Sequence, residues 1–283
     1  MNFIPRRLVA KIFRTLGYNI ESIKGSDDSN LYSEFSLNSI KNKLFLNIGA
    51  GTFNHKYWTN VDYGSKQYAK VQNQFVELNL MEKPKFPFEN ESIELIYSSH
   101  TIEHVNDAAV NNLIEESFRI LKRGGILRIT CPDANLLLNS VKNNVDKYWE
   151  WRHEWFKKNF GIKPKQIEIE DFLVREISTA RCRFFENDIE PLNPKVIREK
   201  LNQLDNEKFL QWMVEKNTFD SNNPQFHINY WTFEKLKNMC EKAGFSTIYH
   251  SGFGQSLSPP LTNTKIFDNT HPKMSLYLEA RKE

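Results

Sequence analysis

The chain has 283 residues, 40% of them hydrophobic and 26% charged, so it can bury the core of one large domain or of a domain with an insertion. Its net charge is only +3, and acidic and basic residues are interspersed, which gives no indication of nucleic-acid binding. An apolar run of about 18 residues, which a transmembrane helix needs, does not occur, and the three widely spaced cysteines, Cys131, Cys182 and Cys240, predict reduced thiols of a cytoplasmic protein rather than disulfides or a zinc site.

The first 42 residues precede the predicted core. Residues 3–16 place apolar side chains at helical spacing and basic side chains on the remaining face. This helix can pack on the domain, cover the active site or lie on an anionic membrane surface, and the pattern favours the first two. Charges interrupt the apolar stretch, which excludes a signal peptide. Residues 21–42 form a polar connector, and the fold proper begins near Lys43.

An apolar run at 44–48 stops at Gly49 and Gly51, which predicts a buried parallel strand followed by a sharp turn. Ligands of open α/β sheets bind at the carboxyl ends of such strands, where glycines let them approach the backbone. Residues 59–62 form a second short strand that ends in Asp62. A carboxylate at the tip of the second strand can accept hydrogen bonds from both hydroxyls of a ribose.

The spacing of these residues differs from a dinucleotide-binding fingerprint. That fingerprint has three glycines and an acidic residue about 20 positions later. Here Asn54 replaces the third glycine and Asp62 follows much sooner. The pattern therefore favours a smaller nucleoside ligand, with an NAD-dependent enzyme as an alternative that a nicotinamide titration would distinguish.

Two further strands are predicted before the first long helix. Residues 75–80 alternate as a third strand and include Asn79, and residues 93–97 form a fourth strand. His100, Glu103 and His104 follow the fourth strand. These three side chains either fix the next loop through hydrogen bonds to the backbone or line the binding site.

The rest of the sequence predicts alternating helices and strands, interrupted by a long helical stretch at 135–225. A helix begins after the N-cap Asn106 and ends near Gly124, and residues 126–131 form a fifth strand. Residues 135–225 are helical and rich in aromatic side chains, most of which should be core. After His227, a helix over 233–243 lies between the N-cap Thr232 and Gly244, and two strands follow at 245–250 and 274–280.

Several of these passages resemble the class I S-adenosylmethionine-dependent methyltransferases. The stretch LNIGAG followed by WTNVD resembles motifs I and II of a type 11 bacterial subgroup with a short first crossover, many of whose members lie in surface-polysaccharide gene clusters. FRILKRGGILRITCPD resembles the LKPGG junction of the same family, and the passage from His227 to Phe245 resembles its H…W-T…AGF segment. The resemblance covers 43–134 continuously.

The resemblance implies an α/β, Rossmann-like fold. Its sheet would have seven mostly parallel strands, with an antiparallel last strand inserted beside the fifth and a helical insertion after strand five. The domain organisation expected from it is a helix and connector at 1–42, the cofactor-binding half of the core at 43–134, an acceptor-covering insertion at 135–225 and the rest of the core at 226–283.

The resemblance also implies S-adenosyl-L-methionine as the cofactor. The positions that match the family's cofactor site are Asn47, Gly49, Ala50, Gly51, Asp62, Asn79, Leu80, Ser99 and His100. Two of them depart from the family pattern, since Asn47 and Asn79 stand where aspartate is common. An amide oxygen at Asn79 could still accept a hydrogen bond from the adenine amine.

Methyl transfer from a sulfonium is an in-line displacement in which the protein mainly aligns donor and acceptor. A hydroxyl acceptor also requires a base near neutral pH, and histidine suits that role. The candidates are His104 and Glu103, followed by His100 and His227, with Asp133 as a further carboxylate. An amine or carboxylate acceptor would need no such base, and no feature indicates a metal.

The sequence therefore predicts a cytoplasmic O-methyltransferase that acts on a small molecule or a saccharide precursor, as in polysaccharide biosynthesis. The predicted partner is this acceptor, without nucleic acid and with peripheral membrane contact only through the N-terminal helix. The alternative is a methyltransferase-fold scaffold without activity, which cofactor binding would distinguish. The acceptor atom and the oligomeric state are not predicted.

Overall fold

The structure is a computed structural model that describes residues 28–64, 75–162, 166–185 and 189–283. The predicted N-terminal helix at 3–16 lies outside these residues. The chain divides into two compact units, Met1–Ser36 and Leu37–Glu283. The described part of the first unit contains the short 3-10 helix η1 (Ser29–Tyr32). The second unit begins with α2 (Leu37–Lys41) and holds the sheet and every predicted site residue.

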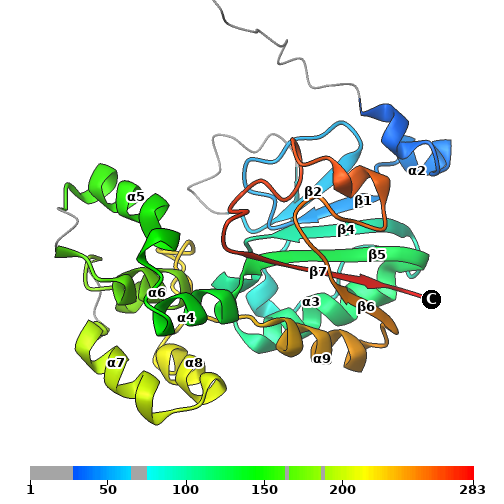
Figure 1. Cartoon of the computed structure of the whole chain (residues 1–283). Helices are drawn as coiled ribbons and strands as arrows, with labels where there is room; N and C mark the ends of the chain where they lie inside the picture. Colours follow the sequence, from blue (N-terminus) through cyan, green and yellow to red (C-terminus); the bar gives the residue numbers. More distant parts are fainter. Residues whose placement is uncertain (1–27, 65–74, 163–165, 186–188) are drawn as a thin grey trace, which may run out of the picture. The chain divides into compact units, whose positions relative to one another are not determined.

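A seven-stranded sheet with the order β3-β2-β1-β4-β5-β7-β6 forms the centre of the second unit (Figure 1). Neighbouring strands are parallel from β3 to β5, whereas β7 is antiparallel to both β5 and β6. This arrangement confirms the predicted fold class. The strands are β1 (Phe45–Ile48), β2 (Trp58–Asp62), β3 (Val76–Glu77), β4 (Ile93–Ser99), β5 (Leu121–Pro132), β6 (Thr247–His250) and β7 (Ser275–Arg281).

The strand order reverses between β1 and β4, which lie side by side although β2 and β3 come between them in sequence. Such a switch point leaves a crevice beyond the carboxyl ends of the two strands. The glycine loop follows β1, and the predicted histidines follow β4. The topology therefore brings these two segments to the same edge of the sheet.

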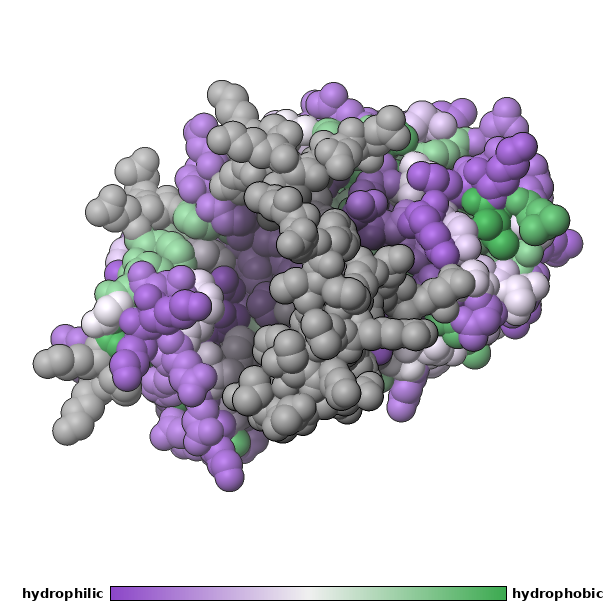
Figure 2. All heavy atoms as spheres, turned by 90° about the horizontal axis from the view of Figure 1, so that it is seen from above, coloured by the Kyte–Doolittle hydropathy of each residue, from purple (hydrophilic) through white to green (hydrophobic). Residues whose placement is uncertain are grey.

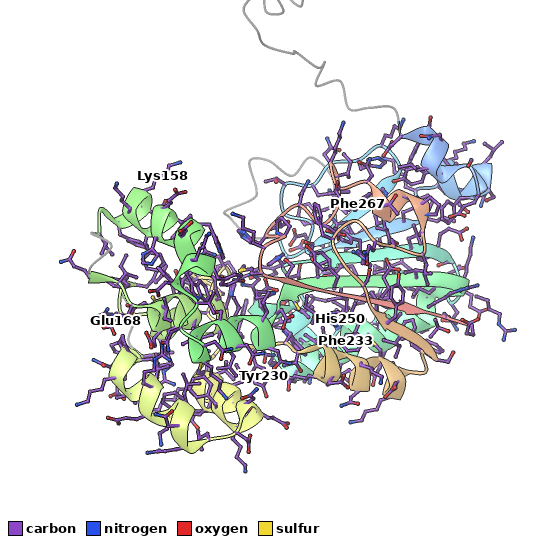
Figure 3. The ribbon with its side chains drawn as sticks, viewed as in Figure 1. Lys158, Glu168, Tyr230, Phe233, His250 and Phe267 are labelled. Atoms are coloured by element: carbon purple, nitrogen blue, oxygen red, sulfur yellow. The ribbon has the colours of Figure 1, made fainter. Side chains whose placement is uncertain are left out.

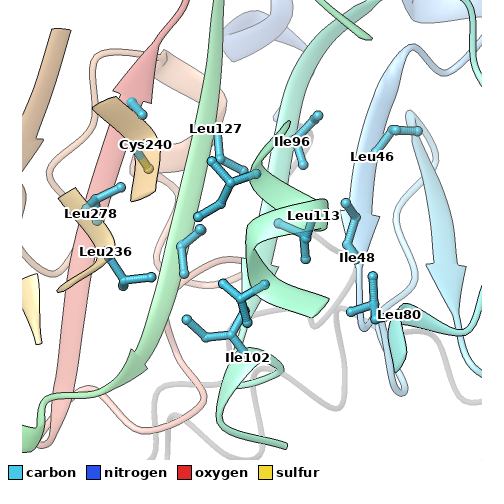
Figure 4. Close-up of a cluster of buried hydrophobic side chains, with 14 of the residues drawn as sticks. Leu46, Ile48, Leu80, Ile96, Ile102, Leu113, Leu127, Leu236, Cys240 and Leu278 are labelled. Atoms are coloured by element: carbon cyan, nitrogen blue, oxygen red, sulfur yellow. The ribbon is translucent and has the colours of Figure 1, made fainter. Parts of the chain in front are cut away.

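Two helices, α3 (Asp107–Ile120) and α9 (Phe233–Ala243), cover one face of the sheet. Asn106 and Thr232 are their N-caps, as predicted, and Gly244 ends α9 with a φ of +109°. Figure 4 shows the aliphatic core between these helices and the strands. Side chains from both helices and four strands meet there, among them Leu46, Ile96, Leu113, Leu127, Leu236 and Leu278.

The opposite face is covered by the segment at 251–274, which includes the 3-10 helix η7 (Pro259–Thr262). Phe267 packs against Trp58 and Tyr97 of the sheet, with ring centroids 4.9 and 5.1 Å apart. The fully buried Arg128 of β5 pairs with Asp268 of this segment and with Glu279 of β7. A buried ion-pair network thus fastens an irregular segment to the sheet.

The insertion after β5 forms a second apolar cluster of its own. Trp149 and Phe156 are fully buried in it, which confirms the core prediction for these two, whereas Phe160 is 37% exposed. Its α-helices are α4 (Ala134–Lys142), α5 (Glu150–Phe160), α6 (Ile169–Ile177), α7 (Pro194–Gln203) and α8 (Asn206–Val214). The second unit also contains the 3-10 helices η3 (Ile102–His104), η4 (Asp146–Trp149) and η6 (Thr179–Arg181).

Two predicted boundaries were wrong. The helix after Asn106 ends at Ile120, and Gly124 and Gly125 lie inside the long strand β5 rather than at the helix terminus. The third strand is limited to β3, because Leu80 already belongs to the 3-10 helix η2 (Leu80–Glu82). In β5, Gly124 adopts a positive φ that glycine tolerates, and the strand includes it. After β3, the Asn79 side chain caps η2 and starts a turn where the strand was expected to continue.

The three cysteines are free and buried, as expected for reduced thiols. None of the helices among the described residues is long and apolar enough to cross a membrane. The face seen in Figure 2 is largely hydrophilic. Among the described residues of the second unit, the most exposed large apolar side chains are Leu37 at the start of α2 and Phe253 and Leu257 in the segment at 251–274.

Candidate active site

Asp62 holds the glycine loop and the end of β2 together. One of its carboxylate oxygens accepts a hydrogen bond from the Gly51 N–H at 2.7 Å, and the other accepts from the Tyr63 N–H at 2.7 Å. Each carboxylate oxygen can accept more than one hydrogen bond. The carboxylate is therefore fixed in place at the tip of β2 and can still accept from a ligand.

The glycine loop follows closely on β1. Gly49 has a φ of +71° and donates its N–H to the Val61 carbonyl at 2.8 Å. A Cβ at this position would lie 2.1 Å from the Thr101 hydroxyl oxygen, so the position requires glycine. At Gly51, with a φ of +52°, a Cβ would meet nothing within 4 Å. A side chain at Gly51 would therefore extend into empty space rather than into the protein.

A cavity lies over this loop, at the carboxyl ends of β1, β2 and β4. Its empty volume is about 840 Å³, including the open mouth. Its lining combines the glycine loop and Asp62 with apolar side chains and with the segment after β4, and includes Gly49, Gly51, Asp62, Leu78, Leu80, Met81, His100, Thr101, His104 and Val105.

The structure divides the predicted cofactor residues between two cavities. Gly49, Gly51, Asp62, Asn79, Leu80 and His100 line the large cavity. Asn47, Ala50 and Ser99 line a second, smaller one instead, together with Gly49. Strand alternation accounts for this division, because Asn47 and Ile48 point to opposite faces of the sheet.

The side chain of Asn79 is used by its own turn. It is the N-cap of η2, where its oxygen accepts from the Met81 N–H at 3.1 Å, and its amide nitrogen donates to Glu82 at 2.9 Å. The amide oxygen has a second lone pair, so these bonds do not exclude a ligand contact. They do fix the orientation of the side chain at the rim of the cavity.

His100, which lines the cavity, forms a pair with the buried Glu103. His100 has a φ of +50°, and its ring nitrogens contact Glu103 at 3.0 Å and the Ser275 hydroxyl at 2.8 Å. Burial, the largest influence, would raise the pKa of Glu103, but the hydrogen bond from His100 and the charges of the neighbouring histidines outweigh it and lower that pKa to about 2. Glu103 is therefore a carboxylate at neutral pH, and both nitrogens of His100 are already engaged.

His104 and His227 lie together on the other side of Glu103. Their ring centroids are 4.9 Å apart in a T-shaped arrangement. The His104 side chain is 21% exposed and lines the cavity, whereas His227 is buried, and its burial, followed by the charge of His104, lowers its pKa to about 3. Of the four predicted catalytic residues, His100 and His104 line the cavity, and the His104 side chain is the more exposed of the two, at 21% against 7%.

Asp133 does not join this group. It caps α4, where its carboxylate accepts from the N–H groups of Asn135 and Leu136 at 3.0 and 3.1 Å. Burial raises its pKa, while these two hydrogen bonds oppose the increase. Its role in the structure is that of an N-cap.

The structure adds lining residues that the sequence analysis did not identify. Thr101 lies between the two strand tips, with its hydroxyl oxygen 3.3 Å from the carbonyl oxygens of Ile48 and Ser99. Phe219, Pro224 and Gln225 reach the cavity from the loop that ends the insertion. Thr101 could have been predicted because it directly follows His100 in the sequence. Phe219, Pro224 and Gln225 could not, because their loop has no periodic pattern.

Residues 46–129 match a family model described as a methyltransferase domain. No protein in the curated set matches the chain. Among solved structures, a SAM-dependent methyltransferase from Archaeoglobus fulgidus is similar at 12% identity over 99% of this chain and 100% of that chain, with a TM-score of 0.40.

Two other solved structures are similar at the same level. A SAM-dependent methyltransferase from Thermotoga maritima has 14% identity over 98% of this chain and 97% of that chain, with a TM-score of 0.39. One from Mesorhizobium loti has 12% identity over 92% and 100%, with a TM-score of 0.38. The segment that matches the methyltransferase-domain model, residues 46–129, contains the glycine loop, Asp62 and the histidines that follow β4.

Proposed function

We propose that the chain is an S-adenosylmethionine-dependent methyltransferase that binds this cofactor in the cavity over the glycine loop. The observation that carries the proposal is the position of Asp62. Its carboxylate is fixed by two backbone N–H groups at the tip of β2, on the wall of a cavity that Gly51 also lines. A ribose with two adjacent hydroxyls can donate to such a carboxylate.

The other walls of the cavity suit the two ends of this cofactor. Leu78, Leu80 and Met81 offer an apolar surface for the flat purine ring. Gly49 and Thr101 lie at the tips of β1 and β4, where backbone groups can hold the amino-acid end. When bound, the cofactor supplies a methyl group on a sulfonium, and the chain supplies alignment.

The acceptor side of the site supports O-methylation. His104 reaches the cavity, and its Nδ1 lies 3.1 Å from the Phe226 carbonyl oxygen, to which it donates. This bond leaves Nε2 as the ring nitrogen with a lone pair, which can take a proton from an acceptor hydroxyl. Glu103, 4.0 Å from that Nε2, would stabilise the imidazolium that forms.

The acceptor class follows from the resemblance of the sequence and from the insertion. A saccharide precursor or another small molecule fits a site whose outer wall includes the Phe219 ring, because aromatic rings pack on the apolar faces of such molecules. Polysaccharide biosynthesis in the cytoplasm is the corresponding setting. A screen of sugar nucleotides that measures release of S-adenosylhomocysteine would identify the acceptor.

A scaffold without methyl-transfer activity is the second candidate. The engagement of Asn79 with Met81 and Glu82 favours it, because the side chain at the expected adenine contact is already hydrogen-bonded within its own turn. Absence of S-adenosylhomocysteine binding by the unaltered chain would support this alternative.

The first test is calorimetric titration of the chain with S-adenosylhomocysteine, in parallel with Asp62→Asn and the control Glu77→Gln. Asp62 and Glu77 are register partners at the ends of adjacent strands, but only Asp62 lines the cavity. Loss of a hydrogen bond to a charged group costs about 1.5–3 kcal/mol, so Asp62→Asn should weaken binding about 10- to 100-fold and Glu77→Gln should leave it unchanged. Equal affinity of all three proteins, or no binding by any, would overturn the proposal.

A further inference from the structure

Three potential metal ligands from distant parts of the sequence meet beside the large cavity. Glu103 and His104 come from η3, after β4, and His227 comes from the segment that follows the insertion. One ligand atom from each lies within 4.8 Å of the others. The Ile228 N–H donates to the Glu103 carbonyl at 2.9 Å, which holds the two segments side by side.

Both histidines are oriented in the way that metal-binding histidines usually are. Nδ1 of His104 donates to the Phe226 carbonyl at 3.1 Å, and Nδ1 of His227 donates to the Glu176 carbonyl at 2.6 Å. A backbone carbonyl on one ring nitrogen fixes the tautomer and directs the lone pair of the other nitrogen. In both rings that second nitrogen is Nε2.

Glu103 supplies the third ligand, and one of its carboxylate oxygens has no hydrogen-bond donor among the described residues. The side chain is only 1% exposed, and its Oε1 contacts His100 at 3.0 Å. Its Oε2 is buried, and no donor among the described residues reaches it. A buried carboxylate oxygen without a partner is costly, whereas a cation beside it would offset that cost.

We propose that Glu103, His104 and His227 bind one divalent transition-metal ion. Two imidazoles and one carboxylate are a ligand set used for zinc and for non-haem iron, and nitrogen ligands disfavour magnesium and calcium. Ligand bonds of about 2.0–2.2 Å allow two ligand atoms to lie at most about 4.4 Å apart. Small side-chain rotations within the 4.8 Å cluster therefore suffice to close the site.

The bound ion would face the cavity through His104, which lines it. Its catalytic role rests on the proposed methyltransferase function. The ion lowers the pKa of an acceptor hydroxyl, whose proton leaves to water, and the acceptor oxygen attacks the methyl carbon. As the oxygen–carbon bond forms, the carbon–sulfur bond breaks and its electron pair stays on sulfur. In the presence of the ion, His104 is a metal ligand and not a base. The ion then activates the acceptor hydroxyl in place of the His104 imidazole.

The test uses the full chain without a histidine tag, titrated with Zn²⁺ by calorimetry and with Co²⁺ by visible absorption. The variants are Glu103→Gln, His104→Gln and His227→Gln. His250→Gln is the control, because His250 lies in β6, stacks on Phe233 of α9 with ring centroids 4.6 Å apart (Figure 3) and is not one of the clustered ligands.

The expected result is one ion per chain, with Co²⁺ absorption of a low-symmetry site. Each ligand variant should weaken binding at least about 100-fold, because even outer partners of metal ligands contribute about 10- to 100-fold. His250→Gln should bind like the unaltered chain. His104→Gln is the decisive variant, since its side chain is partly exposed and its loss disturbs folding least.

Retention of the ion by all three variants, or its absence from the unaltered chain, would overturn the metal site. Titration of the same preparations with S-adenosylhomocysteine separates this failure from that of the proposed function. Cofactor binding without metal binding would contradict only the metal site, and metal binding without cofactor binding would contradict only the methyltransferase assignment.

Discussion

At the scale of single residues, the two glycines after β1 differ in what surrounds them. Both have positive φ, which costs an alanine about 1–2 kcal/mol. Gly51→Ala should lower the free energy of unfolding by about this amount, since no atom lies within 4 Å of the added Cβ. Gly49→Ala should lower it further, because its Cβ would collide with the Thr101 side chain.

Chemical denaturation of the two variants checks this prediction. A larger loss for Gly49→Ala, with a smaller one when Thr101 is replaced by alanine in the same chain, would confirm the collision, because the two closest atoms, Oγ1 and Cγ2, are then removed. Equal losses would show that only backbone strain matters.

Residue by residue, the sequence could predict the positions that a local motif determines. Gly49, Gly51 and Asp62 are such positions, and all three line the large cavity. The meeting of His227 with Glu103 and His104 could not be predicted, because it depends on how the chain returns from the insertion to the sheet. The engagement of Asn79 was missed for another reason: its turn replaces the expected continuation of a strand.

At the scale of elements, the insertion and the sheet have separate apolar clusters. Phe172 on α6 and Leu113 on α3 are both fully buried, one in each cluster. Removal of a large buried side chain costs about 2–5 kcal/mol. Phe172→Ala should therefore speed amide hydrogen exchange mainly in α4 to α8, and Leu113→Ala mainly in α3 and the strands beneath it.

Exchange measured by mass spectrometry on proteolytic fragments would distinguish the two patterns. The same acceleration in both regions for either variant would mean that the insertion and the sheet unfold as one cooperative unit.

The elements themselves were largely predictable. Alternation, glycines and N-caps located β1, β2, β4, α3 and α9 to within a few residues. The covering segment at 251–274 was not predicted, because its packing depends on single long-range contacts, such as Phe267 on Trp58, rather than on any repeat. The helices on one face of the sheet could therefore be predicted from sequence periodicity, whereas the segment that covers the other face could not.

At the scale of the whole second unit, Arg128 links parts of the chain that are far apart in sequence. Its guanidinium donates to Asp268, to Glu279 and to the carbonyls of Gly252 and Gln255. Arg128→Met would leave two buried carboxylates without their cation, which should cost about 3–5 kcal/mol. Arg123→Met, on an exposed part of the same strand, should change stability by no more than about 0.5 kcal/mol.

Thermal and chemical unfolding of both variants tests the link. A small effect of Arg128→Met would mean that the segment at 251–274 is held by its aromatic contacts alone. Restoration of stability in a triple variant that also replaces Asp268 with Asn and Glu279 with Gln would confirm that uncompensated charge is the cause.

The burial of all three cysteines makes the chain suitable for site-specific labelling. Burial raises the pKa of the Cys182 and Cys240 thiols to about 12 and that of Cys131 well above its ordinary value, so few thiolates form at neutral pH. A maleimide dye should then react with a newly introduced surface cysteine and spare the native ones. A donor placed on α5 and an acceptor placed on α9 would report, by energy transfer, whether the insertion moves when a ligand enters the cavity.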